Sequence, residues 1–544
     1  MIPPWSHLAH RFPLPTGLRS AARAPVLAVA LLAVVVPHLV AQGAPTAFVN
    51  VSVLPMDSPE VLREMTVVVE NGRISSVALA AEAVIPDGAS VVDGTGLFLM
   101  PGLVDMHAHL DSDPSPDYLK VFLAAGTTTL RNLNALPEHA DWKQQVLDGD
   151  LIGPTILTSG PVIAGPPDRS LVWIFWALQT AAVSAAGLLV WLALRLISRG
   201  KPVAAPRPRA RRIVTWLGAM GAASAALIVS KVVPLNLYTR TTFPQAYIVD
   251  TEARARAEVR RQAAAGYDMI KPYDYMAPEQ YLGVLQEAST EGIYAAGHLD
   301  VGISEALEAG IRDIVHVDEF LEYHTAEPLS LTSFRPVSFD YSGIPATVAT
   351  VRDHDAAVVV NLTTDVNTVR YLEVGPDYFL RPEYSVLRPQ YREGLQTGRV
   401  VRWAPQEAWR RDHLNPFLFE LTRQLHEGGV LLLAGTDASM DNGSLPAHIH
   451  DELQLQVAAG LSPFEALRTA TVNAQIVAAR MGDEDLFGRI APGYRGDLLL
   501  LRMNPLEDIR ATTERVGVMT RGSWYPQAEL DAMVADFVAG LGVQ

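Results

Sequence analysis

The sequence predicts an α/β fold: a parallel (β/α)8 barrel, a small β-domain built from both flanks of that barrel, and an inserted pair of membrane-spanning helices. Three observations predict this arrangement. Eight short apolar runs alternate with helical stretches, which is typical of parallel strands covered by helices. The two flanking regions alternate apolar and polar residues, as antiparallel strands do. Two long segments carry almost no charge, as membrane spans require.

The eight apolar runs mark the strands of the predicted barrel. Several of the helical stretches between them end in glycine, which often terminates a helix. Eight strand–helix repeats are what a parallel barrel requires. The runs are residues 99–110, 127–134, 154–162, 267–273, 293–299, 313–319, 356–364 and 430–439. We expect the barrel over residues 99–168 and 236–485, and the small β-domain over residues 45–98 and 486–530.

Composition limits both the partners and the metal chemistry of the chain. Its 544 residues carry a net charge of −16, which argues against nucleic acid as a partner because phosphate backbones select clustered Lys and Arg. An apolar content of 49% is high and indicates that part of the chain meets a lipid bilayer. There is no cysteine, so a bound metal would need His, Asp, Glu or a modified Lys.

Residues 1–44 have the pattern of a targeting segment. Arg11, Arg19 and Arg23 precede the apolar run APVLAVALLAVVV, and small residues follow it. A basic stretch, an apolar core and small residues are the three parts of a secretory signal peptide. We favour a cleaved signal peptide, with an uncleaved N-terminal anchor as the alternative.

Residues 171–233 predict a transmembrane helical hairpin inserted between the third and fourth barrel strands. Its two arms, 171–197 and 213–233, reach or approach the ~20 residues that a helix needs to cross the hydrocarbon core. The alternative is a pair of buried core helices. The linker 198–212 carries six Lys or Arg residues and no acid, so the positive-inside rule places it in the cytoplasm. The catalytic region is then expected on the outer, periplasmic side of a bacterial-type inner membrane.

Metal-competent side chains follow five of the predicted strands. His107 and His109 are two positions apart, so a strand would direct both to one face, where they could share an ion. The carboxyl ends of barrel strands form the rim where active sites are built. Six groups at this rim are difficult to explain as buried structural residues. They are His107, His109, Lys271, His298, His316 and Asp437.

These motifs make the chain recognisable. The stretches PGLVDMHAHL, YDMIKPY, GHLDVGISEALEAGIRDIVH, LLLAGTDA and LSPFEALRTATVNAQ resemble the amidohydrolase superfamily, nearest to its imidazolonepropionase-like and Xaa-Pro-dipeptidase-like branch. The resemblance covers residues 45–530 apart from the insertion at 165–250. It implies a distorted (β/α)8 TIM barrel with a composite β-sandwich.

The resemblance also implies a site with two divalent metal ions, of which zinc is the expected one. His107, His109 and Asp437 would hold the first ion, and His298 and His316 the second. Lys271, converted by CO2 to a carbamate, would bridge them; a plain lysine beside a single ion is the alternative. The implied reaction is hydrolysis of an amide-type C–N bond in a dipeptide, an N-acyl amino acid or a cyclic amide. Asp437 would act in turn as base and acid.

Other candidates have weaker support. Tyr273 shares the strand face of Lys271 and could contact substrate, as could His448 and His450, for which a solvated helix start is the alternative. A homo-oligomer is also compatible with the sequence. Two further functions stay open: a catalytically inactive barrel serving as a membrane-bound sensor or binding module, and a mononuclear deaminase of cyclic amidines.

Overall fold

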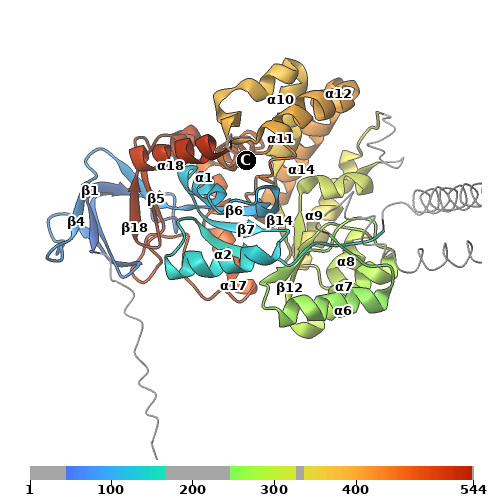
Figure 1. The fold of residues 1–544 in the computed structure, drawn as a ribbon, viewed down its shortest axis with the longest axis horizontal. Coiled ribbons are helices and arrows are strands. Elements are labelled where there is room, and N and C mark those ends of the chain that lie inside the picture. Colours follow the sequence, from blue (N-terminus) through green and yellow to red (C-terminus); the bar gives the residue numbers. More distant parts are fainter. Residues whose placement is uncertain (1–43, 167–245, 326–335, 542–544) are drawn as a thin grey trace, which may run out of the picture. The chain divides into compact units, whose positions relative to one another are not determined.

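The computed structural model describes residues 44–166, 246–325 and 336–541 (Figure 1). The predicted targeting segment, up to residue 43, and the predicted hairpin at 171–233 lie outside the described residues. Within the described ranges, no helix is both long enough and apolar enough to cross a bilayer.

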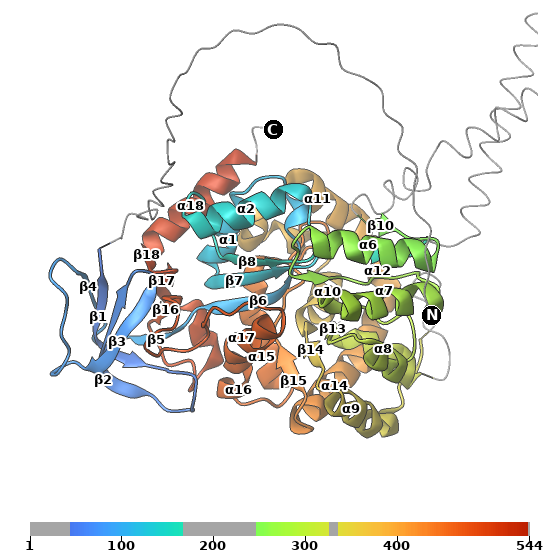
Figure 2. The ribbon, with the colours of Figure 1, turned by 90° about the horizontal axis from the view of Figure 1, so that it is seen from below.

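Both flanks of the chain contribute to one sheet of eight strands. The order is β18-β17-β16-β5-β1-β2-β3, with β4 beside β1. Two facing sheets were implied, but a single hydrogen-bonded sheet forms because β5 pairs with both β1 and β16. In Figure 2 the red C-terminal strands lie beside the blue N-terminal ones. The strands are β1 (Thr46–Val53), β2 (Leu62–Glu70), β3 (Arg73–Leu79), β4 (Ser90–Asp93), β5 (Phe98–Pro101), β16 (Leu498–Leu501), β17 (Arg515–Thr520) and β18 (Ser523–Pro526).

Strand β16 joins the small sheet to the rest of the molecule. Its sequence is LLLL, and every residue is buried. Leu498 and Leu500 pack in the core of the small sheet, whereas Leu499 and Leu501 pack in the main core. Successive strand side chains point to opposite faces, so an uninterrupted apolar run fits a strand that is covered on both sides.

The rest of the described chain alternates parallel strands with helices, and each of the eight predicted runs contains one strand. Three strands form one parallel sheet and five form another. Single parallel bridges connect the sheets, Ser159 with Met269 and Ala108 with Ala438. The strands are β6 (Leu103–Ala108), β7 (Thr127–Asn132) and β8 (Thr155–Thr158), then β11 (Met269–Ile270), β12 (Tyr294–Gly297), β13 (Asp313–Val315), β14 (Ala357–Val359) and β15 (Leu431–Leu433).

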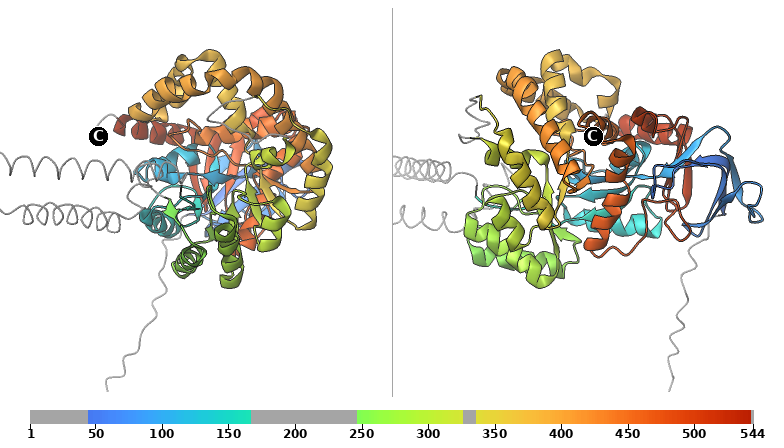
Figure 3. Two further views of the ribbon diagram at one scale, coloured as in Figure 1. Left: turned by 90° about the vertical axis from the view of Figure 1, so that its right-hand side faces the viewer. Right: turned by 180° about the vertical axis from the view of Figure 1, so that it is seen from behind.

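Helices flank these strands (Figures 2 and 3). Those between consecutive parallel strands are α1 (Tyr118–Ala124), α2 (Pro137–Asp148), α6 (Glu252–Ala264), α7 (Pro278–Glu291), α8 (Ile303–Ala309), α9 (Ile344–Asp353), α10 (Leu362–Val374), α11 (Pro389–Gly394), α12 (Val400–Trp403), α13 (Glu407–Trp409) and α14 (Asn415–Glu427). Four more follow β15: α15 (Ile449–Ala458), α16 (Pro463–Thr469), α17 (Val472–Arg480) and α18 (Gln527–Gly540). A short pair, β9 (Ile163–Ala164) and β10 (Tyr247–Ile248), borders the segment outside the described residues.

Strand β5 continues almost directly into β6, with only Gly102 between them. A Cβ atom at this position would lie 2.1 Å from the Oγ1 atom of Thr128, so the close approach of β7 requires glycine. The strand that carries His107 is therefore positioned by the small sheet at one end and by its parallel neighbours along its length.

Candidate metal centre

Strand β6 and the segment after β15 are joined by hydrogen bonds around one buried carboxylate. Asp105 accepts hydrogen bonds from the Thr436 hydroxyl at 2.5 Å and from the backbone N–H groups of His107 and Thr436, each at 3.1 Å. The Asp437 N–H in turn donates to the carbonyl of His107 at 2.8 Å. These bonds fix the backbone of His107 directly against that of Asp437.

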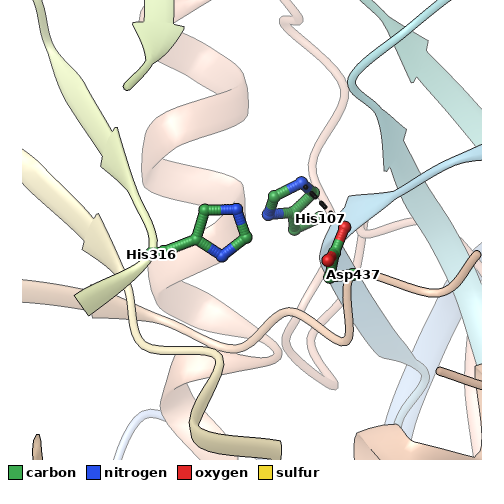
Figure 4. A group of neighbouring side chains, drawn as sticks. All are labelled: His107, His316 and Asp437. Atoms are coloured by element: carbon green, nitrogen blue, oxygen red, sulfur yellow. Dashed lines mark ion pairs between the residues drawn. The ribbon is translucent and has the colours of Figure 1, made fainter. Parts of the chain in front are cut away.

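Three ligand candidates converge as a result. The Nε2 atoms of His107 and His109 are 3.2 Å apart, and they lie 3.4 and 3.1 Å from the Oδ1 atom of Asp437. His316, at the end of β13, faces them, with its ring centroid 4.4 Å from that of His107 (Figure 4). Ligand atoms of His107, His316 and Asp437 all lie within 4.8 Å of one another.

Lys271 and His298 complete the group from the other side. Lys271 is fully buried, and its Nζ atom has no hydrogen-bond partner among the described residues. The Nε2 atom of His298 is likewise buried without a partner within the described ranges. The ring centroids of His298 and His316 are 5.3 Å apart. Tyr273 packs its ring on His298, with a centroid distance of 4.4 Å.

Burial sets the protonation of this group. It holds the pKa of His107 and His316 well below the usual range, so both imidazoles are neutral. Burial also lowers the pKa of Lys271 to about 8, although the carboxylates of Asp437 and Glu319 partly offset it. A neutral amine is the form that reacts with CO2.

His109 and Asp437 behave as an ion pair. Burial acts to lower the pKa of His109, but its hydrogen bonds to Asp111 and Asp437 outweigh this and raise it to about 10. Burial likewise acts to raise the pKa of Asp437, but the hydrogen bond and charge of His109 lower it to about 2. Asp437 is therefore a carboxylate, the form that both a metal ligand and a general base require.

The residues fit divalent ions. Neutral imidazole nitrogens and a carboxylate oxygen are the donors that zinc prefers when thiolates are absent. His109 would release its proton on binding an ion, as metal-ligating groups do. Buried polar atoms normally have hydrogen-bond partners, so the lone Nζ of Lys271 and Nε2 of His298 are the atoms that a bound ion or carbamate would satisfy.

Two ligand candidates have unusual backbone angles. His316 has φ 97° and Asp437 has φ 51°, values that side-chain-bearing residues rarely adopt. Such conformations cost of the order of 1–3 kcal/mol each and are concentrated at functional sites.

His448 and His450 lie apart from the ligand group. His448 Nδ1 accepts from the Leu445 N–H at 3.1 Å, and burial lowers the pKa of this histidine to about 4. His450 contacts the Thr512 hydroxyl at 3.0 Å through Nδ1 and the Arg515 guanidinium at 2.7 Å through Nε2. Both ring nitrogens of His450 thus have side-chain partners, and its substrate contact stays a prediction.

Four polar residues that support the site were missed at the sequence level. One is Asp105, which holds the backbone as described above. The other three contact ligand side chains: Asp274 contacts His298 Nδ1 at 2.6 Å, Asn361 contacts His316 Nδ1 at 2.9 Å, and Asn442 donates to Asp437 Oδ2 at 2.9 Å. Asp105 lies within the motif PGLVDMHAHL, and Asp274 directly follows the motif YDMIKPY, which was the available signal. Asn361 lies near the carboxyl end of the predicted run 356–364 but outside the quoted motifs, and Asn442 lies in a loop that carries no such signal.

Comparison with known proteins defines the class. A model described as the amidohydrolase family matches residues 98–525, so the chain belongs to this family of hydrolases acting on carbon–nitrogen bonds. Ochratoxinase from Aspergillus niger is 22% identical over 446 residues, covering 76% of this chain and 72% of the relative.

Solved structures share the fold. The bottromycin amidohydrolase AH is similar with a TM-score of 0.60 and 20% identity, covering 92% of each chain. A Xaa-Pro dipeptidase with bound methionine is similar with a TM-score of 0.58 and 17% identity, covering 89% of this chain and all of that one. At these identities the likeness concerns the fold alone.

Proposed function

We propose that the chain is a two-metal amidohydrolase that cleaves the amide bond of a small molecule inside a closed, distorted (β/α)8 barrel. The observation that carries this proposal is the convergence of His107, His109, His316 and Asp437 beside two buried nitrogen atoms that have no partner among the described residues. Zinc is the expected metal. His107, His109 and Asp437 would hold one ion, His298 and His316 the other, and a carbamate on Lys271 would bridge them.

Two divalent ions, when bound, supply an activated water and polarise the carbonyl that it attacks. Asp437 moves the proton: as a carboxylate it accepts one from the attacking water and then gives it to the departing nitrogen. The new C–O bond forms first and the C–N bond then breaks, and the products are a carboxylic acid and an amine. Asn442 keeps the carboxylate oriented through its 2.9 Å contact with Oδ2.

The substrate class follows from the relatives and not from the site alone. Names such as ochratoxinase, Xaa-Pro dipeptidase and bottromycin amidohydrolase support amide-bearing small molecules. We therefore propose a dipeptide, an N-acyl amino acid or a cyclic amide. Tyr273, which packs on His298, is the proposed substrate contact, and His448 is a weaker one.

Metal content tests the centre directly. Elemental analysis of the purified full-length chain should find two zinc-like ions, and Lys271→Ala should lose at least one. Lys120→Ala is the matched control, because Lys120 only pairs with Asp117 near the surface. One ion that Lys271→Ala leaves unchanged would favour the mononuclear deaminase, and no ion after reconstitution would favour the inactive sensor.

Activity is tested separately. A panel of dipeptides and N-acyl amino acids should release free amine with the wild type but not with Asp437→Asn, which keeps the shape of the side chain and removes the base. Amine release by Asp437→Asn at the wild-type rate would refute the assigned proton transfer.

We further propose membrane tethering, with the catalytic region on the periplasmic side. The support is the sequence of residues 1–44 and 171–233, together with the basic linker 198–212. Alkaline carbonate should then leave the chain in the membrane fraction, and protease added to spheroplasts should degrade the catalytic region. Release by carbonate, or protection from protease, would refute the tethering and leave the proposed chemistry untouched. That the chain forms a homo-oligomer stays a prediction, and a measurement of its size in detergent would test it.

A further inference from the structure

Asp274 makes a short contact with a ligand candidate. Its Oδ1 atom lies 2.6 Å from Nδ1 of His298. Glu319 also approaches this nitrogen, but at 3.4 Å, and its other oxygen accepts the Leu299 N–H at 2.7 Å. Glu319 is thus committed to the backbone, and Asp274 is the direct partner of the imidazole.

This contact determines which nitrogen of His298 is available. A carboxylate accepts hydrogen bonds, so the Nδ1 atom beside Asp274 carries the proton. The lone pair then lies on Nε2, the buried atom without a partner among the described residues. The ring itself lies beside that of His316, with a centroid distance of 5.3 Å. The orientation and the tautomer of His298 are therefore both set for metal binding.

The backbones of both partners are held independently of the contact. The carbonyl of Asp274 accepts the Gly165 N–H at 2.9 Å, and the Tyr273 N–H donates to Ile163 at 2.8 Å. The His298 N–H donates to Pro272 at 3.1 Å, and its carbonyl accepts the Tyr281 hydroxyl at 2.6 Å. Loss of the Asp274 carboxylate would thus free the imidazole without releasing either segment.

We infer that Asp274 is the positioning residue for the second metal ion: it fixes the ring and tautomer of His298 and thereby sets the affinity of that ion alone. This inference rests on the proposed two-metal function. The Asp274 carboxylate pairs with His298, a candidate ligand of the second ion, so the first ion should be insensitive to its removal. Partners of this kind typically contribute about 10–100-fold to metal affinity.

The test is an equilibrium titration of metal-depleted full-length protein with Zn²⁺ and, for its visible spectrum, with Co²⁺. Asp274→Ala should weaken the second binding step about 10–100-fold and leave the first step unchanged. Asp274→Asn should fall between Asp274→Ala and the wild type, because its amide oxygen still accepts the Nδ1 proton but carries no charge.

Asp300→Asn is the matched control. Asp300 accepts the Met276 N–H at 2.9 Å and so supports the loop that carries Asp274, through a bond to the backbone and not to the His298 ring. It should bind both ions like the wild type. The thermal unfolding midpoints of the metal-free variants should match, which shows that each variant is folded.

The outcomes separate the two ideas. A wild type that binds one ion refutes the two-metal centre and this inference with it. A wild type that binds two ions, with an unchanged second step in Asp274→Ala, refutes the inference alone. Equal weakening of both steps also refutes it, because Asp274 would then support the whole site and not one ligand.

Discussion

Arg131 and Asp313 form a fully buried ion pair between the two parallel sheets, and breaking it should be costly. Arg131 lies on β7 and Asp313 begins β13, and neither side chain is exposed to solvent. Arg131 Nε also donates to the carbonyl of Met106 at 2.7 Å, within the strand that carries His107. The pair therefore holds β13 against β6 and β7 from the inside.

The expected magnitude follows from burial and contact. Two unit charges about 3 Å apart attract by about 5 kcal/mol at an effective dielectric constant of about 20. Removing one partner leaves the other charge buried and uncompensated, which typically costs about 3–5 kcal/mol. We expect Arg131→Met and Asp313→Val each to lower the free energy of unfolding by this amount. The double variant, which buries no charge, should lose much less than either single variant.

Urea unfolding of the purified full-length chain measures these values. Arg254→Met is the control, because Arg254 pairs with Asp250 at the surface and its loss should change stability by less than about 1 kcal/mol. A double variant whose loss equals the sum of the two single losses would refute the reasoning, since the charges would then act independently.

Three further predictions concern other buried positions. Burial lowers the pKa of His139 to about 4 from its usual 6.5. Between these two pH values the histidine is therefore protonated in the unfolded chain and neutral in the folded chain. The free energy of unfolding should fall by about 2 kcal/mol from pH 8 to pH 5 because of this histidine. Urea titrations at both pH values should show that His139→Gln removes this contribution to the pH dependence. Gly297→Ala would place a Cβ 2.3 Å from the carbonyl oxygen of Pro272. The adjacent residue His298, a proposed metal ligand, should shift, and the zinc content of the protein should fall. A full zinc content would contradict this prediction. Thr436→Val removes the 2.5 Å hydrogen bond to Asp105 and should lower the unfolding free energy by about 1.5–3 kcal/mol, whereas an unchanged urea midpoint would refute it.

Local periodicity explains which site geometry the sequence could predict. His107 lies on β6 and His109 just beyond its end, where the backbone is still extended, and their Nε2 atoms do lie 3.2 Å apart. His448 and His450 have the same spacing, but α15 begins between them. Two residues of helix turn by about 200°, so the two rings diverge and His450 meets Thr512. The pattern alone does not tell strand from helix.

Contacts between residues far apart in the sequence could not be predicted from local sequence patterns. Asp274 reaches His298, 24 positions away, because β11 pairs with β12 and the His298 N–H donates to the carbonyl of Pro272. The alternation of strands and helices was predictable, because each buried parallel strand is an apolar run bounded by helix signals. The single small sheet was not, because nothing in the local sequence indicates that β5 would pair with both β1 and β16.

The sheet that combines both flanks has a consequence for biosynthesis. Strand β5 acquires its antiparallel partner only when residues 498–501 have been made, after every proposed metal ligand. Until then, the strand leading into His107 has one open edge. A chain truncated before residue 498 should therefore keep every proposed metal ligand and still fail to mature, because the anchor of its first ligand strand is synthesised after all of them.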